Sequence, residues 1–333
     1  MVKWDATCYA DMLPKNPSNR ETQTAKTKEA RLKLRYPPLD RNMETTSCII
    51  VDMHGIILTW YLPGILSDSR QVSLLLLSDI SGVPDTSQNA MLAAGKKLHP
   101  LLNGPKDGGY WRNDPKYFNP KGEDPLGSID LSPAWFPQGH DVSASADRVY
   151  FLTAYLNQAT VQKNPQVSVS FKSQAASDWL DAISESNAIL SAILAVIHPT
   201  LYDAGWQTTK RLRDTPEIGA DDILNRWASI FSGVSIICNR FTPPHRDTSS
   251  RWNWYDILTT LGSYRECNMK LPGLGLTLEY GPGAVVGISG KILEHAVPSF
   301  KGDRVCYAYF IRNNVHEWAK VPGSDWMHTK FYE

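Results

Sequence analysis

The sequence of 333 residues lacks the features that mark several large classes of protein. Its five cysteines are an odd number without a close pair, which predicts neither a disulfide framework nor a zinc site and favours a reducing compartment. Lys plus Arg and Asp plus Glu number 34 each, which excludes a uniformly basic coat but not a local basic groove. The N-terminus lacks the basic start and apolar stretch of a signal peptide. The longest apolar run, residues 188–197, is too short to span a bilayer, so no membrane association is expected.

What is present is the composition of a globular protein, with 42% hydrophobic and 20% charged residues. Residues 1–47 are predicted to form a peripheral, basic N-terminal arm. Within it, residues 15–41 hold eight Lys or Arg against three Asp or Glu, and residues 24–35 permit a helix. Such an arm is either a solvated tail or a segment that contacts phosphate. Residues 48–333 are predicted to form one domain.

Hydrophobic patterns predict the elements of that domain. Residues 48–61 are typical of a strand, a tight turn and a second strand, and residues 67–80 suit a helix. Residues 81–148 are rich in Gly, Pro, Asn and Asp and carry scattered aromatic side chains, so we expect an irregular lid on the substrate side. Apolar residues at steps of three and four predict helical support over residues 175–205, where His198 is expected to be structural.

Several short strands are predicted in the last third of the chain. They cover residues 234–238, 252–261, 274–280, 284–288 and 305–312, with Gly and Pro between them. Short strands in succession with such turns indicate an α+β fold. Its core is expected to be a double-stranded β-helix, the cupin-like jelly roll, with flanking helices. Metal ligands commonly lie at the mouth of such a barrel, which makes residues 230–315 the candidate metal-bearing half.

A candidate metal centre lies in this half. His245 and Asp247 are two residues apart, so on a strand both side chains would point to one face. His295 would supply a third ligand from a distant strand. Two imidazoles and a carboxylate can hold one face of an iron(II) ion and leave three positions open for a co-substrate and dioxygen. Arg304, nine residues after His295, is suited to bind a dicarboxylate such as 2-oxoglutarate through its forked guanidinium.

Two other interpretations of these residues compete with iron. The same three ligands could hold zinc, although a zinc hydrolase has no need of the arginine. Alternatively, His245 is a loop residue and His295 a hydrogen-bonded core histidine, since a His-x-Asp tripeptide arises easily by chance. The distal histidine, the Pro282-Gly283 turn before it and the arginine after it together favour the iron centre.

At these residues the sequence resembles the TET/JBP family of dioxygenases, which oxidise methyl groups on DNA bases, and most of all its compact fungal and protozoan members. The resemblance covers residues 48–80, which include the Tyr61-Leu-Pro63 motif, and residues 230–315, which include Pro244-His-Arg-Asp247. It implies that His245, Asp247 and His295 bind iron(II) and that Arg304 binds the far carboxylate of 2-oxoglutarate. It also implies that Arg240 helps to close the co-substrate pocket.

The resemblance extends to the substrate side of the site. Phe310, six residues after Arg304, matches the aromatic residue that stacks on the flipped-out target base. Two positions that contact the base in relatives differ here. Ser250 stands three residues after Asp247, where the family often has Asn or Asp, and Arg312 stands where it often has His. Strict preference for 5-methylcytosine is therefore not implied, and Arg312 could instead contact phosphate.

The expected function is oxidation of a methyl group on a flipped base of double-stranded DNA, with iron(II), 2-oxoglutarate and dioxygen. The expected substrates are 5-methylcytosine, converted to 5-hydroxymethylcytosine and further, and also N6-methyladenine. One alternative is an oxygenase that acts on a protein side chain or another alkylated substrate, and a second is a catalytically vestigial DNA-binding jelly roll. Alkylated-base repair enzymes usually carry a second arginine where this chain has Phe310, which counts against them. A monomer and a nuclear location are expected.

Overall fold

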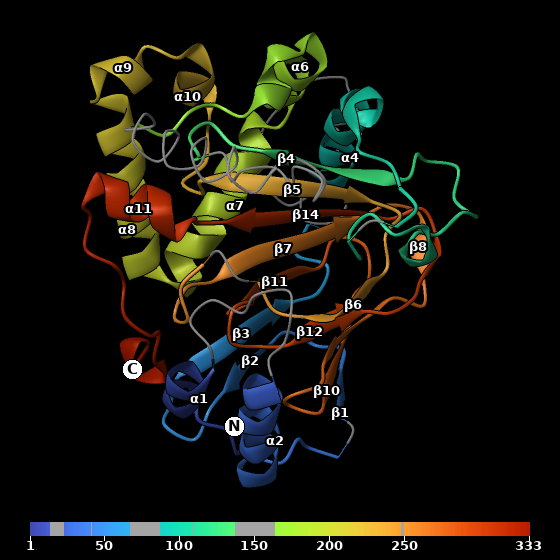
Figure 1. The fold of residues 1–333 in the computed structure, drawn as a ribbon, viewed down its shortest axis with the longest axis vertical. Coiled ribbons are helices and arrows are strands. Elements are labelled where there is room, and N and C mark those ends of the chain that lie inside the picture. The colour runs from blue at the N-terminus through green and yellow to red at the C-terminus, as the bar shows by residue number, and fades with distance from the viewer. Residues whose placement is uncertain (14–22, 41, 67–86, 109, 137–163, 248–249) are drawn as a thin grey trace, which may run out of the picture.

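The structure is a computed structural model that describes residues 1–13, 23–40, 42–66, 87–108, 110–136, 164–247 and 250–333. Its centre is a pair of facing sheets between two groups of helices (Figure 1). The predicted helix at 67–80 lies outside the described residues, as do residues 81–86, 109 and 137–148 of the predicted lid.

The larger sheet has seven strands, and every pair of neighbours in it is antiparallel. In spatial order these strands are β2 (Cys48–Val51), β3 (Ile57–Leu62), β11 (Val285–Ile288), β7 (Asp256–Leu261), β14 (Val305–Phe310), β5 (Gly233–Cys238) and β4 (Gly127–Leu131). The turn between β2 and β3 uses Gly55 at φ +82°, a conformation that favours glycine. The predicted strand–turn–strand at 48–61 is therefore present.

The smaller sheet has five strands and carries the candidate ligands at one edge. In spatial order they are β1 (Asn42–Glu44), β10 (Leu276–Glu279), β9 (Asn268–Leu271), β12 (His295–Val297) and β6 (Thr242–His245). Two short strands, β8 (Tyr264–Arg265) and β13 (Lys301–Gly302), pair with each other as a separate antiparallel ribbon. Two facing sheets of short strands, antiparallel except for the parallel pair of β1 and β10, with helices outside confirm the predicted α+β jelly-roll architecture.

Alternation along the strands of the larger sheet divides the core into two clusters. Ile57 and Ile257 contact the helical side, whereas the next residues, Leu58 and Leu258, face the smaller sheet. The helical side consists of α4 (Ser87–Lys97), α6 (Gln174–Ala182), α7 (Ser184–Ile197), α8 (Pro199–Arg213), α9 (Pro216–Gly219), α10 (Asp222–Arg226) and α11 (Asn313–Ala319). The described residues also form four 3₁₀ turns, at His99–Leu101, Pro115–Tyr117, Val169–Lys172 and Thr329–Phe331.

His198 has a structural position between α7 and α8. Its ring is fully buried, and Nδ1 accepts the backbone N–H of Leu201, so the side chain caps the N-terminus of α8. Nε2 then carries the proton and donates to the carbonyl of Asn253 at 3.3 Å. Burial lowers the pKa of His198 to about 4, so the ring is neutral at pH 7.

The first 47 residues are packed more closely than their composition led us to expect. Helices α1 (Ala6–Met12) and α2 (Gln23–Arg35) lie against the body of the protein, close to the smaller sheet (Figure 1). Trp4, Tyr9 and Leu32 are at most 2% exposed and join the cluster between the sheets. Of the basic residues that the structure describes in α2, Lys28, Arg31 and Arg35 are exposed, and so is Leu34, at 84%.

Residues 81–148 also contain more regular structure than predicted. Helix α4 lies over the larger sheet, and β4 forms its edge beside β5. Gly95 in α4 makes this packing close, because a Cβ there would lie 2.8 Å from the hydroxyl of Tyr307. Local composition did not reveal these elements because their stability comes from contacts with distant strands.

Among the described helices, no single one is long and apolar enough to cross a membrane. Helices α6 and α7 together reach that length and composition, but they are bent by 56° at the break between them.

Candidate metal centre and substrate side

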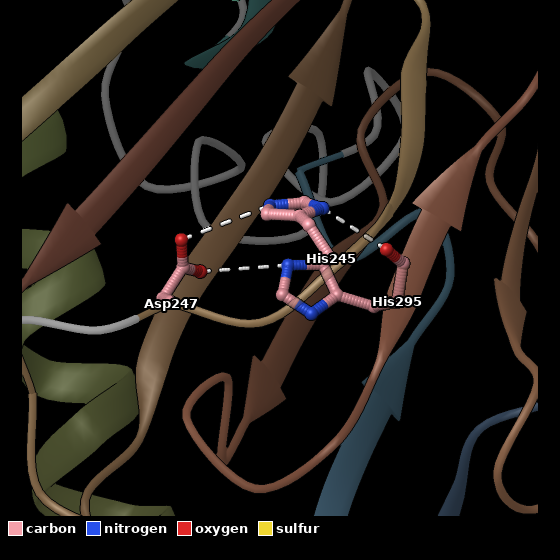
Figure 2. A group of neighbouring side chains, drawn as sticks. All are labelled: His245, Asp247 and His295. Atoms are coloured by element: carbon pink, nitrogen blue, oxygen red, sulfur yellow. Dashed lines mark hydrogen bonds and ion pairs between the residues drawn. The ribbon is translucent and has the colours of Figure 1, made fainter. Parts of the chain in front are cut away.

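Pairing of β6 with β12 brings the two candidate histidines together. His245 ends β6, His295 begins β12, and the two residues are directly opposite in the antiparallel register. Asp247 joins them, and one ligand atom from each of the three residues lies within 4.8 Å of the others. The Nε2 atoms of His245 and His295 are 3.7 and 3.4 Å from the carboxylate oxygens of Asp247 (Figure 2).

Backbone carbonyls fix the orientation of both imidazoles. Nδ1 of His245 donates to the carbonyls of Pro243 and His295, each at 3.1 Å, and Nδ1 of His295 donates to the carbonyl of Leu293 at 3.0 Å. With Nδ1 protonated, the lone pair of each ring is on Nε2, the atom that faces Asp247. Burial, followed by the charge of His295, lowers the pKa of His245 to about 3. The donor set therefore fits a divalent metal ion without a change of tautomer.

Asp247 reaches the centre from a loop rather than from the strand. β6 ends at His245, and the backbone N–H of Asp247 donates to the carbonyl of Gly290 at 2.9 Å. The expected alternation along one strand therefore does not explain the chelate. A Cβ at Gly290 would lie 3.0 Å from the Asp247 carboxylate and 2.7 Å from that of Asp256, so only glycine fits there without displacing a carboxylate.

Two buried guanidinium groups, those of Arg304 and Arg240, lie close enough to interact electrostatically. Arg304 and Arg240 are 3% and 4% exposed, and neither forms an ion pair with a described acidic residue. The Nε atom of each has no hydrogen-bond partner among these residues. Burial, followed by the charge of Arg112, lowers the pKa of Arg240 to about 10, with a smaller contribution from Arg304. Buried cations without an acidic partner are costly, so these two guanidinium groups favour an anion such as a dicarboxylate.

The surroundings of Arg304 keep it charged and oriented. Its guanidinium lies 5.1 Å from the ring centre of Tyr280 and 5.5 Å from that of Phe300. The carbonyl oxygen of the Asn239 side chain accepts the backbone N–H of Arg304 and ties the start of β14 to the end of β5.

A loop from the predicted lid reaches the candidate centre, which sequence reasoning did not reveal. The ring of Trp111 lies 4.9 Å from that of His245, and the guanidinium groups of Arg112 and Arg240 lie 4.5 and 5.3 Å from the Trp111 ring. Nη2 of Arg112 is 3.3 Å from Oδ1 of Asp247. The sequence feature that could have indicated this loop is its run of Tyr, Trp and Arg next to glycines. Nothing nearby in the sequence indicates that Arg112 contacts Asp247, which lies 135 residues away.

The residues predicted to contact the base lie around β14 and the loop after Asp247. Phe310 ends β14 half-buried, and the guanidinium of Arg312 lies 4.7 Å from its ring centre. Gly233 packs against the same ring, where a Cβ would come within 2.8 Å. Ser250 is buried, and its backbone carbonyl accepts a hydrogen bond from the ammonium group of Lys291 at 2.7 Å.

A carboxyl group that the sequence did not single out belongs to this side. Asp256, at the start of β7, is 4% exposed. Burial raises its pKa well above the usual range, and the charge of Asp247 adds to the shift, while Arg312 opposes it. On this side of the site, the buried polar atoms without a partner among the described residues include Oγ of Ser250, Oδ1 of Asp256 and Nε of Arg312. Such groups favour a polar ligand that satisfies them.

Comparison with known proteins gives the site its context. The Tet_JBP family model, the oxygenase domain of the 2OGFeDO superfamily, matches residues 151–313. No curated protein sequence matches the chain. Among solved structures, NgTET1 in complex with 5mC DNA is similar with a TM-score of 0.50 and 12% identity, covering 89% of this chain and 87% of that one. OsALKBH1 covers 76% and 97% at 10% identity, but its TM-score is only 0.27. At 12% identity, the likeness to NgTET1 supports the fold alone.

Proposed function

We propose that the chain oxidises the methyl group of a base flipped out of double-stranded DNA, because residues 151–313 match the Tet_JBP oxygenase domain of the iron(II)- and 2-oxoglutarate-dependent dioxygenases. We propose 5-methylcytosine as the first substrate and N6-methyladenine as a second, and the nucleus as the place of action. The observation that carries this proposal is the His245–Asp247–His295 cluster, together with two buried arginines, Arg240 and Arg304, that have no acidic partner among the described residues. The similarity to NgTET1, a protein solved with 5mC DNA, supports DNA as the substrate.

His245, Asp247 and His295 would hold the iron ion, and Arg304 and Arg240 would bind the carboxylates of 2-oxoglutarate. When bound, iron and 2-oxoglutarate supply the oxidising power through reduction of dioxygen and decarboxylation of the keto acid. The contribution of the protein is to hold the metal ligands and the co-substrate in position. The carbonyls of Pro243 and Leu293 orient the rings of His245 and His295. The buried guanidinium groups of Arg304 and Arg240 would pair with the carboxylates of the co-substrate away from solvent.

The other side of the site would bind the base. Phe310 offers an aromatic ring for stacking, which an extruded base needs in place of its neighbours in the duplex. Ser250, Asp256 and Arg312 provide the unpartnered polar atoms that the edge of a base can satisfy. A carboxyl group and a guanidinium together offer both acceptor and donor sites, which is compatible with more than one methylated base.

The proposal is tested with duplexes that contain either 5-methylcytosine or N6-methyladenine. Each is incubated with the protein, iron(II) and 2-oxoglutarate, and the nucleosides are analysed by mass spectrometry alongside a measurement of succinate. We expect oxidised nucleosides with the wild-type protein and neither product with His245→Ala or Asp247→Ala. Succinate formed without base oxidation would indicate a different substrate, and succinate formed by either variant would contradict the metal centre.

A further inference from the structure

Helix α2 contacts the segment between the first two candidate ligands. Arg246, which separates His245 from Asp247, forms a forked ion pair with Glu29 of this helix. Its Nη1 and Nη2 lie 3.2 and 3.0 Å from Oε2 and Oε1 of Glu29. The two side chains are only 15% and 16% exposed, and a two-point pair of this kind fixes both distance and orientation.

The same helix also contacts the segment before the third candidate ligand. Lys33, one turn after Glu29, lies 3.1 Å from Glu29 and 3.6 Å from Oε2 of Glu294, the residue that precedes His295. Nε of Arg246 donates to the carbonyl of Ile292 at 3.1 Å, so the two segments are also tied to each other. Helix α2 thus joins ligand-bearing segments that lie 50 residues apart in the chain.

The ion pairs are separate from the contacts that attach the helix to the core. Leu32 and Tyr36, 1% and 4% exposed, anchor α2 and the residue after it in the cluster between the sheets. Partly buried ion pairs contribute little net stability, because desolvation offsets much of their attraction. Their geometric effect is greater here, because they act on the residues next to all three candidate ligands.

We infer that α2 is a positioning element for the metal centre, in which Glu29 and Lys33 hold the 245–247 and 292–295 segments at the spacing that the metal requires. The inference rests on the proposed function, since it takes His245, Asp247 and His295 as the ligands. A site held at this spacing before the metal arrives binds it more tightly, because less ordering remains to be done.

Cobalt(II), an iron(II) substitute that can be titrated without turnover, measures this effect. Binding is followed by cobalt absorption and by quenching of tryptophan fluorescence, because the ring of Trp111 lies beside His245. We expect Glu29→Ala to weaken cobalt binding about tenfold, as losses of groups that orient metal ligands do, and Glu29→Gln to weaken it less. Lys28→Ala, at an exposed position on the same helix, should leave the affinity unchanged.

Leu32→Ala separates positioning from general stability. It removes the apolar anchor of the same helix, so it should lower the melting temperature more than Glu29→Ala while weakening cobalt binding less. Wild-type affinity in folded Glu29→Ala and Glu29→Gln, or the reverse order of the two effects, would overturn the inference. Asp247→Ala tests the proposed centre itself, and cobalt binding that survives this change would refute the centre. If Asp247→Ala abolishes cobalt binding but the Glu29 variants bind cobalt with wild-type affinity, only the role of α2 is refuted.

Discussion

Nη2 of Arg112 lies 3.3 Å from Oδ1 of Asp247, so a guanidinium from the 110–117 loop touches the carboxylate of the candidate metal centre. A positive charge at this place opposes a metal cation and favours an anionic co-substrate. Arg112 should therefore weaken the binding of the metal ion and strengthen the binding of the co-substrate.

Arg112→Gln is expected to strengthen cobalt(II) binding and to weaken 2-oxoglutarate binding. Both side chains are about one third exposed, so solvent screens the pair and each change should be about two- to fivefold. Isothermal titration with cobalt first, and then with 2-oxoglutarate on the cobalt-loaded protein, measures the two affinities. Arg211→Gln, a charge on α8 far along the chain from this loop, serves as the control. Changes of the same sign would contradict this electrostatic account.

Arg304→Met is expected to raise the stability of the protein without co-substrate and to abolish 2-oxoglutarate binding. The substitution removes a buried charge that has no acidic partner and keeps an unbranched side chain of moderate length, so a gain of about 1–3 kcal/mol is expected. Chemical denaturation, with and without 2-oxoglutarate, gives both quantities. A less stable variant that is still stabilised by 2-oxoglutarate would show that the guanidinium has another partner.

Asp256→Asn is expected to leave cobalt binding within about twofold and to change the choice of base. Asn keeps the shape of the carboxyl group but alters its pattern of donors and acceptors. A polar group that pairs with a substrate can change discrimination by more than tenfold when it no longer matches. The ratio of kcat/KM for the two methylated duplexes gives the result, with Asp130→Asn as a control on β4. An unchanged ratio would remove Asp256 from the substrate side.

His198→Asn is expected to reduce the loss of stability in acid. The pKa of His198 is lowered to about 4 from 6.5, so below pH 6.5 the unfolded chain binds a proton that the folded chain does not. This histidine therefore lowers the free energy of unfolding as the pH falls from 6.5 to about 4, by about 3 kcal/mol in total. Asn can still cap α8. Urea denaturation at pH 7 and pH 4.5 tests this, and an equally steep loss in the variant would contradict it.

The sequence predicted the parts of the fold that local patterns encode. The strands near residues 234–238, 284–288 and 305–310 are apolar runs between turns, and the helical segment from residue 175 has a clear three- and four-residue period. The His245, Asp247 and His295 cluster was also predictable, because two imidazoles and one carboxylate are the ligand types that iron(II) takes in such centres.

Other parts of the site depend on contacts between distant segments. Arg112 meets Asp247 across 135 residues, and Glu29 meets Arg246 across 217. Neither contact has a local signature, since an arginine in a Gly-rich loop and a glutamate on a basic helix are both ordinary surface residues. Asp256 was overlooked for a similar reason, because its burial depends on how β7 packs beside Gly290.

The order of strands in the larger sheet determines how far the chain could be shortened. β2, β3 and β4 lie outside residues 151–313, and they cover β11 on one side and β5 on the other. A fragment limited to those residues would present two bare strand edges, each able to recruit another chain. The smallest fragment that folds by itself is therefore expected to be larger than residues 151–313, the part that the family model matches. Expression of residues 151–313 alone should give aggregates.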